Sequence, residues 1–167
     1  TLGIVPTRPE TGFGYIQLGE CVDTNNAVIR DHVHDVRTFA EKPDQATAQR
    51  FMDAGDFVWN SGLVVARLGV MQRNLNHYLP DHAPMFAALA RHVGTDTYAS
   101  ELVSTYQQIR AVSFDHGVLE HASRVFVIES AFGWSVVGTW DELYRLAMKD
   151  GKNNVIEGNV VTLHTTN

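Results

Sequence analysis

Short apolar runs that alternate with segments of helical spacing are the feature that most constrains this fold. The run 57–66 is apolar at nearly every position, with Asn60 as its polar exception. Such a run is typical of a strand inside a sheet covered on both faces. Further strands are expected over 1–7, 13–18, 36–40 and 124–129, and helices over 44–54, 69–78, 81–92, 98–109, 113–120 and 139–148. This alternation predicts an α/β fold with a layered mixed sheet flanked by helices.

Two of the expected helices carry clear end signals. Asp44 can cap the first amides of the helix over 44–54, and Gly55 can end it in a left-handed turn. Thr139 and Glu142 have the spacing of a capping box at the start of the helix over 139–148.

Composition excludes several functional classes. The formal net charge of −6 disfavours a nucleic-acid groove, which needs clustered Lys and Arg. No apolar stretch approaches the roughly 20 residues of a membrane-spanning helix. Cys21 is the single cysteine, so neither an internal disulfide nor a thiolate metal cluster can form. We therefore expect a cytoplasmic protein without nucleic-acid or membrane partners.

Polar residues at the edges of two apolar runs indicate a ligand. Glu41, Lys42 and Pro43 follow the strand expected over 36–40, and Asn60 lies within the run 57–66. A carboxylate can accept two neighbouring sugar hydroxyls, an ammonium can neutralise a phosphate, and an amide both donates and accepts. An acid, a cation and an amide together suit a phosphorylated sugar.

Four segments together resemble a known family: 8–16 (RPETGFGYI), 59–62 (WNSG), 113–120 (SFDHGVLE) and 134–140 (WSVVGTW). In order and spacing, with Glu41-Lys42-Pro43 between them, they resemble the sugar-phosphate half of bacterial mannose-1-phosphate guanylyltransferases, which are sugar-1-phosphate nucleotidyltransferases. The resemblance implies an incomplete Rossmann-like nucleotidyltransferase domain over 1–152, the C-terminal sugar-binding part of the catalytic domain. On this resemblance the N-terminal, glycine-rich nucleotide-binding part would be absent, and 153–167 would begin a β-rich extension with a strand over 155–163.

The resemblance also assigns roles to individual residues. It implies that Gly12 and Gly14 bring their backbone against the hexose. Glu41 would read sugar hydroxyls, Lys42 would hold the phosphate and serve as the catalytic cation, and Asn60 would supply an amide. Asp115 would help to shape the sugar pocket, although Asp115 and Glu120 could equally cap or salt-bridge a helix.

One position departs from the family pattern. Where the family has an aspartate that helps to coordinate magnesium, this chain has Val136. A hydrocarbon cannot replace an oxygen ligand of a hard cation. Helix-dipole contact explains Asp141 well enough without a metal role. The intact family enzyme is expected to use Mg²⁺, whereas this chain alone is expected to bind none.

The implied reaction makes GDP-mannose and pyrophosphate from mannose 1-phosphate and GTP, with this fragment inactive alone. A homologue that lost its metal carboxylate and senses sugar phosphates or nucleotide sugars is the alternative, favoured by Val136. The sequence leaves a homo-oligomer open.

Overall fold

The structure, a computed structural model, describes residues 1–23 and 32–166. The chain forms two compact units, Thr1–Ala131 and Phe132–Asn167. The expected division into 1–152 and 153–167 remains a prediction about the parent protein.

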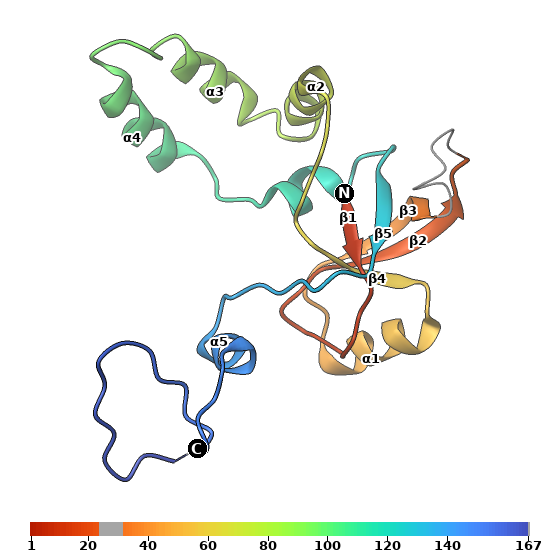
Figure 1. Cartoon of the computed structure of the whole chain (residues 1–167). Coiled ribbons are helices and arrows are strands. Elements are labelled where there is room, and N and C mark those ends of the chain that lie inside the picture. Colours follow the sequence, from red (N-terminus) through yellow and green to blue (C-terminus); the bar gives the residue numbers. More distant parts are fainter. Residues whose placement is uncertain (24–31, 167) are drawn as a thin grey trace. The chain divides into compact units, whose positions relative to one another are not determined.

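In residues 1–23 and 32–131, the first unit is built on a five-stranded mixed sheet. The strands are β1 (Leu2–Ile4), β2 (Tyr15–Cys21), β3 (Val33–Ala40), β4 (Phe57–Asn60) and β5 (Phe126–Ser130). Their order is β1-β4-β2-β3-β5, and the sheet closes because β5 also pairs with β1 (Figure 1). β1 and β5 run parallel, while the β1–β4, β4–β2, β2–β3 and β3–β5 pairs are antiparallel. The predicted α/β class with a mixed sheet is confirmed. The closure of this sheet was not predicted.

Apolar side chains from three strands form the centre of the sheet. Ile16 on β2, Val58 on β4 and Val127 on β5 are almost fully buried and pack together. Ile16 lies opposite Val58 in the ladder, and Tyr15 lies opposite Trp59. Tyr15 and Trp59 are also buried, so the paired side chains of β2 and β4 are shielded from water. We call this buried contact between β2 and β4 the central seam.

Helix α1 (Gln45–Ala54) begins and ends where its cap residues predict. The Asp44 carboxylate accepts a hydrogen bond from the Thr47 backbone N–H at 2.7 Å, and Gly55 has φ 76°. The same backbone hydrogen bond is the main cause of a lowered pKa of Asp44. Phe51 of α1 stacks on Phe57 with ring centroids 4.1 Å apart, which attaches the helix to the start of β4.

A helical insertion follows β4. It contains α2 (Leu68–Tyr78), α3 (Ala83–Ala90), α4 (Tyr98–Gln108) and a π-helical turn, η2 (Asp115–Leu119). The buried His82 ring nitrogen Nε2 lies 2.8 Å from the backbone oxygen of Arg110, which ties the start of α3 to the segment before η2. The short helix expected over 113–120 is present as the single π-helical turn η2. Among the described residues, no helix is both long and apolar enough to cross a membrane.

The expected strand over 57–66 is only partly correct. It stops at Asn60, and beyond it Leu63 is half exposed and Val65 is 89% exposed. Gly62 has φ 73°, and its N–H is accepted by the Asn60 side-chain oxygen at 3.1 Å, so the chain turns out of the ladder. Apolar composition alone does not reveal this turn.

The second unit contains α5 (Trp140–Leu146), whose Glu142 N–H bonds to the Thr139 hydroxyl at 3.2 Å, as the capping spacing predicts. The strand expected over 155–163 is wrong, because those residues have no regular structure and no strand pairs with them in the described part of this unit. Val160, Val161 and Leu163 are exposed instead.

The central seam generates a stability prediction. Replacing the fully buried Ile16 with Ala leaves a cavity against Val58 and Val127, and such changes cost about 2–5 kcal/mol. Chemical denaturation should show this loss, whereas Val65→Ala should change the unfolding free energy by less than about 0.5 kcal/mol. Equal effects of the two substitutions would show that this seam is not the core.

Candidate functional site

The candidate site lies where three adjacent strands begin or end. β2 runs between β3 and β4. Tyr15 lies opposite Ala40 on one side and Trp59 on the other. Gly14, just before Tyr15, therefore lies between Glu41, just after β3, and Asn60, the last residue of β4. Residues far apart in the sequence thus meet because of strand register.

Gly14 is in close contact with both neighbours. Its backbone oxygen accepts the Asn60 N–H at 2.8 Å. A Cβ at position 14 would lie 2.6 Å from Oε2 of Glu41 and 3.4 Å from the Asn60 Cβ. A side chain at position 14 would therefore have to displace the flexible end of Glu41, and Gly14 is not among the described residues with a positive φ.

The Asn60 side-chain amide is held in one orientation. Its Nδ2 donates to Asp115 Oδ1 at 2.7 Å, while its Oδ1 accepts from Gly62 N at 3.1 Å. Because a carboxylate can only accept, the partner fixes which amide atom is nitrogen. One Nδ2 hydrogen then remains for a ligand. Asp115, one of the predicted site residues, thus contacts another of them directly.

Glu41 and Lys42 supply opposite charges at the surface of the site. Lys42 Nζ lies 3.7 Å from Glu41 Oε1, and the two side chains are 66% and 37% exposed. Both charged groups are accessible to a ligand because their side chains are exposed. Their ion pair is also weak at this distance, so a ligand could replace it at little cost. Lys42 also has φ 45°, an unusual conformation for a residue with a side chain, directly before Pro43. The chain thus turns at Lys42, two residues after β3 ends at Ala40.

Gly12 differs from Gly14. A Cβ at position 12 would have only Glu10 Oε1 within 4 Å, at 3.4 Å, so the fold does not bring Gly12 against Glu41 or Asn60. Instead, the Gly12 N–H donates to that same Glu10 oxygen at 3.1 Å. Glu10 and its ion-pair partner Arg8, 2.9 Å away, belong to a predicted motif but had no assigned role. The position of Glu10 two residues before Gly12 is the sequence feature that could have indicated this hydrogen bond.

The described residues do not offer a fitting site for Mg²⁺. Val136 belongs to the second unit, where its hydrocarbon side chain is half exposed. Within residues 1–23 and 32–166, no three His, Cys, Asp or Glu side chains gather closely enough to hold a metal ion. The donor set that a hard cation needs is not assembled by these residues.

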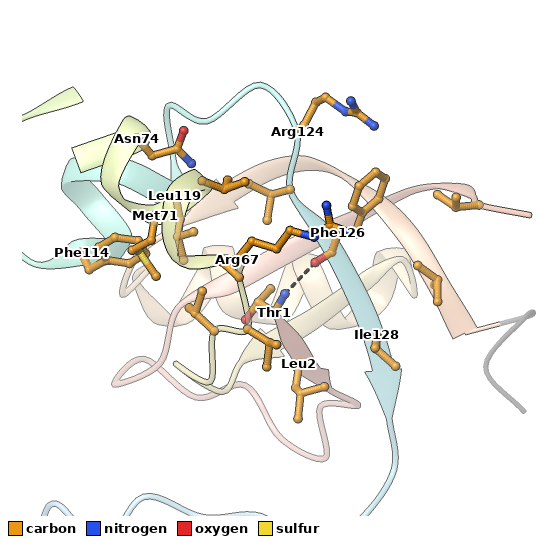
Figure 2. Close-up of a pocket in the computed structure, with 17 residues that line it drawn as sticks. Thr1, Leu2, Arg67, Met71, Asn74, Phe114, Leu119, Arg124, Phe126 and Ile128 are labelled. Carbon is orange, nitrogen blue, oxygen red and sulfur yellow. Dashed lines mark hydrogen bonds between the residues drawn. The ribbon is translucent and has the colours of Figure 1, made fainter. Parts of the chain in front are cut away.

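The first unit also contains a hollow of about 580 Å³ beside β1 and β5, shown in Figure 2. Its lining is mostly apolar, from Leu2, Met71 and Phe114 among others, with Arg67 across it and Arg124 at its edge (Figure 2). Neither Gly14 nor the Glu41, Lys42, Asn60 and Asp115 side chains line it. Its described lining includes no carboxylate, although Asn74 contributes a side-chain amide and Thr1 a hydroxyl.

A protein-family model described as nucleotidyl transferase matches residues 1–153. A mannose-1-phosphate guanylyltransferase from Escherichia coli is 33% identical over 100% of this chain and 36% of its own length. The alginate biosynthesis protein AlgA from Pseudomonas syringae pv. tomato is 35% identical over 99% of this chain and 33% of its own length. The chain thus spans about a third of these curated relatives and matches their N-terminal rather than their C-terminal part.

Solved structures support the same fold. A protein from Thermus thermophilus, named a mannose-1-phosphate geranyltransferase, aligns with TM-score 0.71 and 32% identity over 95% of this chain and 42% of its own. A mannose-6-phosphate isomerase from Helicobacter pylori aligns with TM-score 0.62 and 22% identity over 77% and 48% of the two chains. The second likeness concerns the fold alone.

The contact at Gly14 generates a prediction. In Gly14→Ala, the new Cβ must displace the far end of the flexible Glu41 side chain. We expect the unfolding free energy to change by less than about 1 kcal/mol. If mannose 1-phosphate binds here, as the sequence predicts, its affinity should fall about tenfold, equivalent to about 1.4 kcal/mol, because the displaced carboxylate would no longer meet the hexose.

Calorimetric titration and thermal unfolding of the same samples measure both quantities. Gly133→Ala is the matched control, since a Cβ there meets nothing within 4 Å. Unchanged binding by Gly14→Ala would contradict a hexose seated against this backbone.

Proposed function

We propose that this chain, which belongs to the nucleotidyl transferase family, is the sugar-phosphate half of a guanylyltransferase that makes GDP-mannose and pyrophosphate from mannose 1-phosphate and GTP. The observation that carries the proposal is the placement of Glu41 and Asn60 on either side of Gly14, with Lys42 next in the chain. The names of relatives such as the Escherichia coli protein support the choice of substrate. The residues present here are proposed to bind sugar phosphate and to be inactive alone.

Each group has a distinct task in this proposal. The Glu41 carboxylate accepts two neighbouring hexose hydroxyls, which orients the ring. The second Nδ2 hydrogen of Asn60 donates to a sugar oxygen, and Asp115 keeps the amide turned toward it. Gly14 lets the Glu41 carboxylate lie close to the backbone beside the proposed ring position, because a Cβ at position 14 would lie 2.6 Å from Glu41 Oε2.

Lys42 acts on the phosphate. Its ammonium neutralises part of the phosphate charge and holds one phosphate oxygen in position to attack the α-phosphorus of GTP. The bond between that phosphorus and the pyrophosphate oxygen then breaks, and pyrophosphate leaves. Such transfers depend mainly on alignment and charge neutralisation, so no enzyme nucleophile is required. No step is assigned to a metal, because the described residues do not fit one.

A second candidate function follows from Val136. A homologue without the metal carboxylate would bind mannose 1-phosphate or a nucleotide sugar without turnover, as a sensor or a regulator of an active partner. Both candidates share the proposed sugar-phosphate site, a cytoplasmic location and small-molecule rather than nucleic-acid ligands. A homo-oligomer is compatible with either.

The role of Lys42 has a direct test. Lys42→Ala should weaken mannose 1-phosphate binding about tenfold, since hydrogen bonds to charged groups contribute about 1.5–3 kcal/mol and this side chain is largely exposed. Mannose binding should not change. Calorimetric titrations with both ligands measure the difference, and Lys152→Ala removes an equivalent exposed charge as a control. Equal losses for the two ligands would refute a phosphate role.

Val136→Asp separates the two candidate functions when tested in the full-length protein. If the parent is an enzyme limited by this position, the substitution should raise pyrophosphate release about tenfold, equivalent to about 1.4 kcal/mol of barrier, and only when Mg²⁺ is added. Val136→Asn, a neutral polar change of similar size, is the control. A protein that binds mannose 1-phosphate but releases no pyrophosphate in either form would favour the sensor.

A further inference from the structure

We infer that Glu10 is a positioning residue that holds the Gly12–Gly14 turn at the depth needed to receive the hexose. This inference rests on the proposed sugar-phosphate site. Glu10 would act without touching the sugar, because its carboxylate is already occupied by two partners from its own turn.

Glu10 links three parts of the turn. Its Oε1 accepts the Gly12 N–H at 3.1 Å, and its Oε2 accepts Arg8 Nη2 at 2.9 Å and Nε at 3.1 Å. Its own backbone N–H donates to the Tyr15 hydroxyl at 2.9 Å. Because Tyr15 is fully buried, this last bond anchors the turn to the core at the point where β2 begins.

Arg8 supports the same turn against β4. Its guanidinium carbon lies 5.3 Å from the Trp59 ring centroid and 6.0 Å from that of Phe13. Phe13 itself packs edge-on against Trp59 at 5.2 Å. Trp59 directly precedes Asn60, so the aromatic support and the sugar-reading amide belong to one buried strand end.

The position of the turn matters because Gly14 has little freedom. Its oxygen is bonded to Asn60 N, and the Glu41 carboxylate lies against its Cα. A shift of residues 12–14 would move the backbone on which the hexose rests relative to both side chains. Restraining the turn before binding lowers the ordering cost that ligand binding otherwise carries. Loss of Glu10 should therefore weaken mannose and mannose 1-phosphate alike, unlike loss of Lys42.

The test combines ligand titration with a double-mutant cycle. Glu10→Ala should weaken both ligands about tenfold, equivalent to about 1.4 kcal/mol, and Glu10→Gln should restore part of the loss because its amide oxygen can still accept the Gly12 N–H. Glu10→Ala added to Gly14→Ala should cost much less than it does alone, since both disturb the fit of the hexose against Gly14 and Glu41. Glu20→Ala, an exposed carboxylate on β2, is the control.

Amide hydrogen exchange provides a readout independent of any sugar. In Glu10→Ala, exchange should become faster at Gly12 but not at the buried Ile16, which shows that the fold is intact. Normal ligand binding by this variant, additive losses in the cycle, or unchanged Gly12 exchange would each overturn the inference. Failure of the unsubstituted protein to bind either ligand would overturn the proposed function itself, whatever the exchange result.

Discussion

The pairing of β2 with both β3 and β4 is the interaction on which the rest of the structure depends. It buries Ile16 against Val58 and Tyr15 beside Trp59, and it fixes the register between the strands. A slip of one residue would turn these side chains to the other face and move Gly14 away from Glu41 and Asn60. Stability and the candidate site therefore share one determinant, which is why the site occurs where the strands begin and end.

The charged, polar and aromatic side chains near these strand ends divide into two sets. Glu41, Lys42 and Asn60 are available to a ligand, with Asp115 holding the amide. The other set, Arg8, Glu10 and the aromatic pair of Phe13 and Trp59, supports the turn through ion-pair and ring contacts within the protein. This division explains how two glutamates near one glycine-rich turn differ in role. Glu10 bonds the turn itself, while Glu41 keeps an exposed carboxylate.

Local signals in the sequence predict local structure well here. Asp44 and Gly55 mark the ends of α1 because capping depends on a few neighbouring atoms. The α/β class also agrees with prediction, and Glu41 and Asn60 lie beside Gly14, while their binding roles and that of Gly12 stay predictions. Closure of the sheet, the end of β4 at Asn60 and the irregular 155–163 segment were missed. Sheet closure and the irregular 155–163 segment depend on which distant strand is available for pairing, whereas β4 ends at the local turn of Asn60 and Gly62; apolar composition reveals neither.

The most direct test of the central claim is a crystal structure of this chain with mannose 1-phosphate. The hexose is predicted to lie against the Gly14 backbone, with hydroxyls on the Glu41 carboxylate and the Asn60 amide and the phosphate on the Lys42 ammonium. A ligand bound in the apolar hollow beside β1 and β5, or a Gly14 surface left empty at saturating ligand, would contradict the claim.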